Sequence, residues 1–133
     1  MGVYIGSDGK TVFELIQTDF LDENGSKTYC FTCKVGSHKF AAELENIWFY
    51  GVDLLNFAEE VEHLIKNPKK SSASLNAMTD FSCIVQLSDS LGHFTIKTKM
   101  ESRVHQNSAS LMIEAETQTL SNFASELRAV LKN

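Results

Sequence analysis

One amphipathic pattern occurs twice in this chain and constrains its fold more than any other feature of the sequence. Residues 53–67 form the first copy and residues 119–133 form the second, 66 positions further on. In both copies, apolar residues recur at the spacing that places them on one side of an α-helix. The matching apolar positions are Leu54, Phe57, Ala58 and Leu64 in the first copy and Leu120, Phe123, Ala124 and Val130 in the second. Each helix therefore needs a core to cover one of its sides.

The ends of these helices can also be predicted. Asp53 and Thr119 are residue types that accept hydrogen bonds from the first turn of a helix, so we expect them to be the N-caps. The first helix should end at Asn67, because Pro68 disfavours the helical conformation of the residue before it.

The segments that precede each helix alternate between apolar and polar residues, which is typical of strands with one buried face. A two-residue hairpin loop at Gly36 and Ser37 would pair Val35 with His38 and would put the apolar side chains of both strands on one face. A similar loop at Leu91 and Gly92 is expected in the second half. The turn at 22–26 contains Gly25, which can adopt positive φ.

Three antiparallel strands followed by a helix are therefore predicted in each half, at about residues 11–67 and 77–133. A chain of 133 residues can bury one sizeable core, whereas about 65 residues are marginal for a core of their own. We predict a single α+β domain with an internal duplication. Its antiparallel sheet would have about six strands, with helices near 53–67 and 119–132 packed on the apolar side. Two three-stranded sheets around a pseudo-twofold axis would fit the same pattern.

Charge is distributed unevenly between the halves. Residues 1–66 hold eleven acidic residues and five lysines, a net charge of −6, whereas residues 67–133 hold six acidic and seven basic residues, a net charge of +1. An acidic surface repels nucleic acid and anionic membranes, and it accelerates association with basic proteins. Alternatively, the negative charge only keeps the protein soluble. No apolar run is long enough to span a membrane and no secretion signal is evident, so we expect a cytoplasmic location.

The sequence contains no motif that indicates catalysis or a cofactor. Cys30 and Cys33 have C-x-x-C spacing, but the alternation around them predicts a strand, where the two sulfur atoms would point to opposite faces. Four histidines, at 38, 63, 93 and 105, are scattered without a nucleophile at a recognisable spacing. Glu59, Glu60 and Glu62 are expected to lie on a solvated helix face rather than around a metal. We predict a protein that is not an enzyme and holds no metal or cofactor.

The aromatic run at residues 48–50 has two interpretations. Its side chains could close the edge of the sheet. Alternatively, one or two of them could be exposed among carboxylates as the anchor of a binding surface for a basic partner. On that interpretation, the residues that bind the partner are Glu43, Glu45, Trp48, Tyr50, Glu59 and Glu60.

Several segments together resemble the WapI-type immunity proteins of bacterial contact-dependent toxin systems. They are residues 29–40, 47–49, 53–57, 62–64, 92–96, 109–111 and 120–123, within a resemblance that covers about residues 12–131. The resemblance implies an intracellular antidote, a monomer or weak dimer, that binds and blocks the toxin domain of a large secreted protein. In that family the toxin is often a nuclease, and nuclease domains tend to be basic. Family members differ most where they meet their toxins, so no binding residue is transferred.

A competing hypothesis is a small ligand-binding module or a protein-binding module that resembles a secretion chaperone. A ligand-binding module should contain an apolar pocket with a few polar groups that converge on it. A chaperone should dimerise and hold an extended segment of its client.

Overall fold

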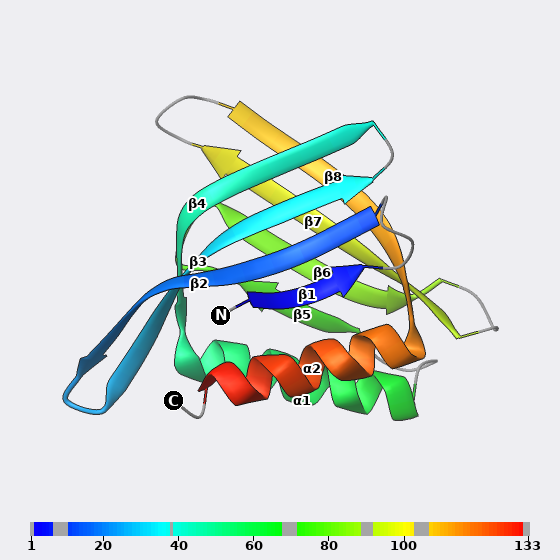
Figure 1. Ribbon diagram of the computed structural model, residues 1–133. Coiled ribbons are helices and arrows are strands. Elements are labelled where there is room, and N and C mark those ends of the chain that lie inside the picture. Colours follow the sequence, from blue (N-terminus) through cyan, green and yellow to red (C-terminus); the bar gives the residue numbers. More distant parts are fainter. Residues whose placement is uncertain are drawn as a thin grey trace.

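The computed structural model describes residues 2–6, 11–37, 39–67, 72–88, 92–102 and 107–131, which fold into strands followed by a helix, twice over (Figure 1). In chain order the elements are β1 (Gly2–Gly6), β2 (Thr11–Glu23), β3 (Ser26–Ser37), β4 (Phe40–Tyr50), α1 (Gly51–Lys66), β5 (Ala73–Asn76), β6 (Phe81–Leu87), β7 (His93–Ser102), β8 (Asn107–Glu116) and α2 (Thr117–Leu131).

The strands form two separate antiparallel sheets, β1-β2-β3-β4 and β5-β6-β7-β8. The predicted α+β class is confirmed, but the prediction of one sheet with about six strands is wrong. Each half contains a fourth strand, β1 or β5, before the three that were predicted. β5 has four residues, of which Ala73 and Leu75 are buried, so it is too short to show a clear alternation in the sequence.

Next to their loops, both predicted hairpin registers are wrong by an even number of residues. Val35 pairs with Ala42 instead of His38, and Leu87 pairs with Phe94 instead of Ile96. Because side chains alternate between faces with a period of two, a shift of four or two residues leaves every apolar side chain on the same face. Alternation therefore identifies the buried face and cannot choose among these registers. His38, in the first loop, lies outside the described residues.

Two bulges shape the first sheet. Thr18 is an extra residue on β2, between the pairs Gln17–Phe31 and Asp19–Cys30. On β4 the register shifts between Leu44 and Ile47, where Asn46 has a positive φ of 58°. The second bulge turns Ile47 towards the interior after two residues that are exposed, so that both ends of β4 contribute to the core.

The helices bury equivalent residues at the offset seen in the sequence. α1 buries Leu54, Phe57, Ala58, Val61 and Leu64, and α2 buries Leu120, Phe123, Ala124, Leu127 and Val130. The predicted end of α1 at Asn67 is confirmed, since the N–H of this residue donates to the carbonyl of His63. The predicted N-caps are wrong. α1 begins after Tyr50 without a side-chain cap, so Asp53 lies in its first turn, and α2 begins at Thr117, before Thr119.

The two helices lie side by side and antiparallel across one end of the sheets (Figure 1). Phe57 and Phe123 are in contact, with ring centroids 6.1 Å apart. On the solvent side, Nε and Nη2 of Arg128 donate to Oε1 of Glu62 at 2.8 and 2.6 Å. Both pairs join residues that are 66 positions apart, so each pairs equivalent positions of the two repeats. A pseudo-twofold axis therefore runs between the helices from the core to the solvent.

Thr98 is a polar residue in the core that the two sheets and helices share. Its side chain is 3% exposed on β7, and Oγ1 has no hydrogen-bond partner. A buried hydroxyl group without a partner costs free energy. We expect Thr98→Val, which keeps the branched shape, to raise the free energy of unfolding by about 1 kcal/mol. Urea unfolding would measure the change, and Thr95→Val on the outer face of the same strand is the control. A lower stability of Thr98→Val would contradict this assignment.

Candidate functional site

The three cysteines, at 30, 33 and 83, are all buried. Cys30 and Cys33 lie on opposite faces of β3, as the alternation predicted, because Cys33 belongs to the core and Cys30 pairs with Trp48 on the outer side. Burial raises the pKa of the Cys33 thiol, and it raises the pKa of Cys83 to about 12. Both thiols stay protonated at neutral pH and are poor nucleophiles. Among the residues that the structure describes, no three His, Cys, Asp or Glu side chains are placed to hold a metal ion.

A long hairpin at the end of β2 and the start of β3 projects beyond the body of the protein (Figure 1). We call residues 19–29 the arm. Its tip is a tight turn in which Asn24 and Gly25 have positive φ of 56° and 84°, and Oδ1 of Asp22 accepts a hydrogen bond from the N–H of Gly25 at 3.1 Å. The arm carries three carboxylates, at 19, 22 and 23, against one lysine, Lys27. It is therefore a projecting acidic element.

The aromatic run at the end of β4 is divided between the core and the surface. Phe49 is fully buried, and its ring lies 5.8 Å from that of Phe31 and 5.6 Å from that of Phe81. Trp48 and Tyr50 point to the other side of the strand, where Trp48 is half-buried and Tyr50 is 49% exposed. The middle residue thus joins the two sheets, while its neighbours are available to a partner.

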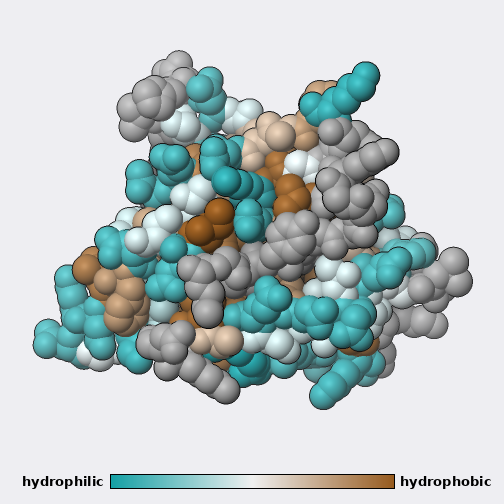
Figure 2. Space-filling model, in the orientation of Figure 1, coloured by the Kyte–Doolittle hydropathy of each residue, from teal (hydrophilic) through white to brown (hydrophobic). Residues whose placement is uncertain are grey.

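Exposed apolar side chains gather where the arm joins the body. Leu21, Thr28 and Tyr50 form one cross-strand row, so Leu21 lies on the same face as Tyr50. The N–H of Met78 donates to the carbonyl of Trp48 at 2.9 Å, which brings the β5–β6 loop to the same place. We define the arm-base surface as Leu21, Trp48, Tyr50, Val52 and Met78; apart from Trp48, all are between 42% and 63% exposed. In Figure 2, hydrophobic residues interrupt the hydrophilic surface on the side of the arm.

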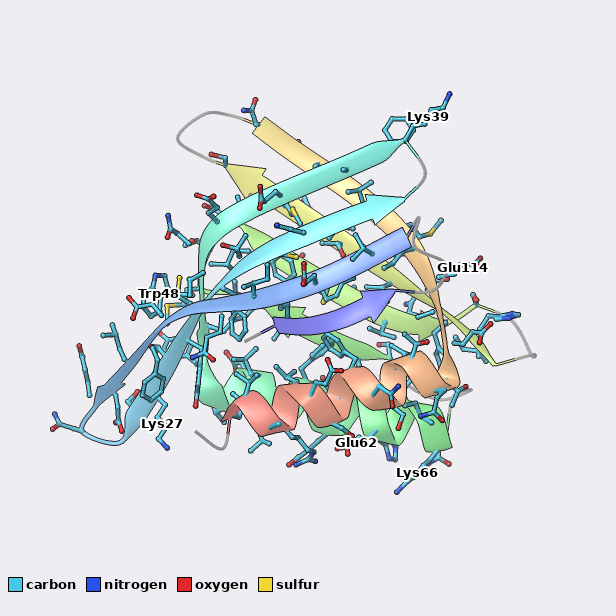
Figure 3. All side chains as sticks on the ribbon, viewed as in Figure 1. Lys27, Lys39, Trp48, Glu62, Lys66 and Glu114 are labelled. Carbon is cyan, nitrogen blue, oxygen red and sulfur yellow. The ribbon has the colours of Figure 1, made fainter. Side chains whose placement is uncertain are left out.

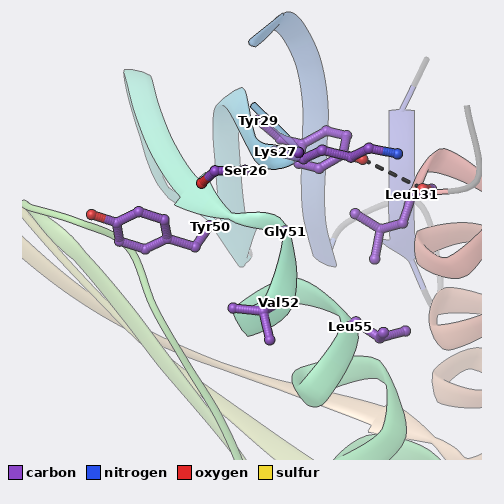
Figure 4. A pocket seen from close by; sticks show the side chains of 9 residues that line it. Ser26, Lys27, Tyr29, Tyr50, Gly51, Val52, Leu55 and Leu131 are labelled. Carbon is purple, nitrogen blue, oxygen red and sulfur yellow. Dashed lines mark hydrogen bonds between the residues drawn. The ribbon is translucent and has the colours of Figure 1, made fainter. Parts of the chain in front are cut away.

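Beside this surface is an open groove of about 360 Å³ between the arm and the helices (Figure 4). Tyr50, Val52, Leu55 and Leu131 supply most of its apolar lining. Tyr29 anchors the arm to the helices, because its hydroxyl donates to the carbonyl of Leu131 at 3.4 Å. Burial, with a smaller contribution from the Asp22 carboxylate, raises the pKa of this phenol.

Gly51, where β4 turns into α1, leaves little room for a side chain. A Cβ atom at this position would lie 3.0 Å from Cε1 of Tyr29 and 3.3 Å from the carbonyl oxygen of Lys27. The missing side chain lets β4 pass close to the arm, and it thereby brings Tyr50 and Val52 to the edge of the groove.

The structure brings together some of the six predicted binding residues and separates others. Trp48 and Tyr50 share the arm-base surface. Glu45 precedes them in β4 and is exposed. Glu43 lies nearer the start of the strand, where its carboxylate forms a salt bridge with Lys34 at 3.7 Å.

The two glutamates on α1 are already engaged within the protein. Glu59 lies two turns beyond Val52, and its carboxylate is 4.0 Å from Arg128, which also binds Glu62. Glu60 lies on the side of α1 that faces β5 and accepts a hydrogen bond from the N–H of Ser74 at 3.4 Å. In Figure 3, Trp48 is beside the arm, whereas Glu62, which shares Arg128 with Glu59, is on the outer side of the helices.

Three members of the arm-base surface, Leu21, Val52 and Met78, and the neighbouring Asp19 were not predicted from the sequence. Leu21 and Asp19 lie in a segment that was predicted as a strand end and a turn, but β2 and β3 continue through it to Glu23 and from Ser26. Asp19 pairs with Cys30, which in turn pairs with Trp48, so this carboxylate lies in the same row as the indole. Val52 and Met78 follow no periodic pattern in the sequence. The aromatic run at residues 48–50 and the high acidity of the first half were the sequence features that pointed to this region.

No protein-family model matches the chain, and no curated protein sequence matches it either. Among solved structures, it is similar to a chain of the Trypanosoma brucei MRP1/MRP2 structures, with a TM-score of 0.50 and 10% sequence identity. The match covers 100% of this chain and 85% of the trypanosome chain. At this identity the likeness concerns the fold alone. Neither α1 nor α2, the helices of the described residues, has the length and apolar character needed to cross a membrane.

Proposed function

We propose that this chain is a toxin-neutralising immunity protein, which binds and inhibits a cognate secreted toxin domain in the cytoplasm without catalysing a reaction. The observation that carries the proposal is the arm-base surface, where Tyr50 and three aliphatic side chains are exposed, with the half-buried Trp48, beside an acidic arm. When a partner buries such side chains, Trp and Tyr contribute a large share of the binding energy of the interface. The resemblance to WapI-type immunity proteins adds the class of partner.

Charge supports a basic partner. Asp19 shares a cross-strand row with Trp48, and Asp22 and Glu23 lie on the same arm. Glu45 precedes the aromatic run on β4, and Lys27 is the one lysine of the arm. A toxin domain that binds phosphate, such as a nuclease, presents basic residues at its active site. Opposite charges on the two surfaces would accelerate association and orient the toxin. The carboxylates of Glu43, Glu59 and Glu60 would add to this field from further away.

The proposal predicts a stoichiometric complex with the toxin domain encoded next to this chain. We expect the co-expressed toxin domain to co-purify in a 1:1 complex, to lose its activity in vitro, and to stop killing the host cell. Raising the ionic strength should slow association, because screening weakens the attraction between exposed charges. A folded chain that neither retains the toxin nor protects the cell would refute the proposal. Binding of a small molecule in the groove, with no effect on the toxin, would favour a ligand-binding module instead.

A further inference from the structure

The two sheets have four edge strands, and two of these are short and covered. β1 has five residues and packs against α2, and β5 has four residues and packs against α1. The N–H of Ser74 on β5 donates to Glu60, so the edge of β5 is occupied from within the molecule. Short strands and covering helices are two of the ways in which proteins prevent a sheet edge from pairing with another chain.

The third edge, β4, is blocked by other means. A bulge at Asn46 interrupts its register, and Glu43 and Glu45 are exposed along the strand. Near the C-terminal end of β4, the carbonyl of Trp48 already accepts a hydrogen bond from the N–H of Met78. Charged side chains and bulges are further devices that protect an edge. A strand of another chain could not pair with β4 along its length.

β8 is the equivalent strand of the second half. Its exposed carboxylates, Glu114 and Glu116, lie at its C-terminal end, and residues 107–113 carry none of these protections. It has ten residues, and its pairing with β7 continues without a register shift from Asn107 to Glu116. Residues 107–113 contain no charge and no proline. Ser110 precedes the inward-facing Leu111, as Glu43 precedes Leu44 on β4, so a serine replaces the protecting carboxylate. Met112 beside it is 62% exposed.

We infer that β8 is a dimerisation edge that pairs antiparallel with β8 of a second copy of this chain. An antiparallel pair of identical strands has twofold symmetry, which is the symmetry of most homodimers. With the axis at Leu111, Met112 would lie opposite Ser110 of the partner subunit, and Glu114 would lie opposite Ser108 of the partner subunit. No like charges are opposed along this uncharged segment. The β5-β6-β7-β8 sheets of the two copies would thereby join into one sheet of eight strands.

The β8 edge is distinct from the proposed toxin-binding surface. The arm projects from one side of the molecule, and β8 runs along the other side and the end furthest from the helices (Figure 1). Dimerisation and toxin binding therefore use different residues, and the failure of one would leave the other unaffected.

Sedimentation velocity over a range of concentrations tests the inference on the full chain. The wild type should be a dimer at about 100 µM protein and dissociate on dilution. Ser110→Glu, which introduces the carboxylate found on β4, and Met112→Lys should each raise the dissociation constant by at least about tenfold. Ile84→Lys is the matched control. Ile84 is an apolar residue of the same sheet and is 40% exposed, but it lies on β6, two strands away from β8. The control variant should leave the dimer intact.

Amide hydrogen exchange identifies the edge that pairs. Protection of residues 107–113 should rise with protein concentration, while that of residues 40–46 on β4 should not change. The inference is overturned if the wild type is monomeric at about 100 µM. It is also overturned if Ile84→Lys weakens the dimer as much as Met112→Lys does, or if exchange in β8 is independent of concentration. Far-ultraviolet circular dichroism of each variant verifies that it is folded.

Discussion

Phe123→Ala is expected to lower the free energy of unfolding by about 3–5 kcal/mol, the largest effect of any substitution considered for this protein. The ring of Phe123 on α2 lies 5.8 Å from Phe13 of the first sheet and 6.1 Å from Phe57 of α1, so it joins three elements on the pseudo-twofold axis. Its side chain is 1% exposed. Alanine would leave a cavity that the two helices and the sheet could close only by moving together.

Chemical denaturation followed by circular dichroism would measure this loss. Phe123→Leu keeps most of the buried volume and should cost less than half as much. Ser125→Ala, on the exposed side of the same helix, should change the stability by no more than about 0.5 kcal/mol. A loss of less than about 1 kcal/mol for Phe123→Ala would show that the helices do not depend on this contact.

Tyr50→Ala is expected to weaken binding of the toxin domain by roughly 30-fold or more, which corresponds to about 2 kcal/mol. Tyr50 is 49% exposed, lines the groove beside the arm and shares a cross-strand row with Leu21. It can therefore bury a large aromatic surface against a partner without first leaving the core. Most of the loss should appear as faster dissociation, because an apolar anchor contributes little to long-range attraction.

Phe40→Ala provides the matched control for this measurement. Phe40 is also an exposed aromatic residue of β4, 73% exposed, but it lies at the opposite end of the strand from the arm. Surface plasmon resonance with the purified toxin domain should show nearly unchanged binding for Phe40→Ala. Equal losses for the two variants, or a greater loss for Phe40→Ala, would move the docking surface away from the base of the arm.

The fold was predicted from the sequence wherever the determining pattern is local. All ten buried positions of the two helices follow the repeated amphipathic pattern, because one helical turn brings nearby residues to the same side. The inward faces of β3, β6 and β7 also agree with the alternation, whereas on β4 the bulge at Asn46 interrupts it and Phe40 is exposed. The hairpin registers, in contrast, depend on which of several equivalent even shifts packs best, and this choice is made by contacts between distant residues.

The candidate site was predicted only in part for the same reason. Trp48 and Tyr50 were predicted as anchors because the aromatic run stands beside acidic residues in the sequence. Their apolar neighbours Leu21 and Met78 come from other elements, and only the tertiary fold brings them to the arm. The four predicted glutamates were grouped by charge and sequence, but three of them are already paired with Lys34, Arg128 or Ser74.

The salt bridge on the pseudo-twofold axis has a consequence for the two halves as separate molecules. Glu62 and Arg128 occupy the same position of the repeat, so each half carries only one sign of charge at the point where the helices meet. Two identical first halves would oppose glutamate to glutamate there, and two second halves would oppose arginine to arginine. Only the mixed pair is complementary. The opposite charges therefore favour association of each half with the other half. They disfavour association of either half with a copy of itself.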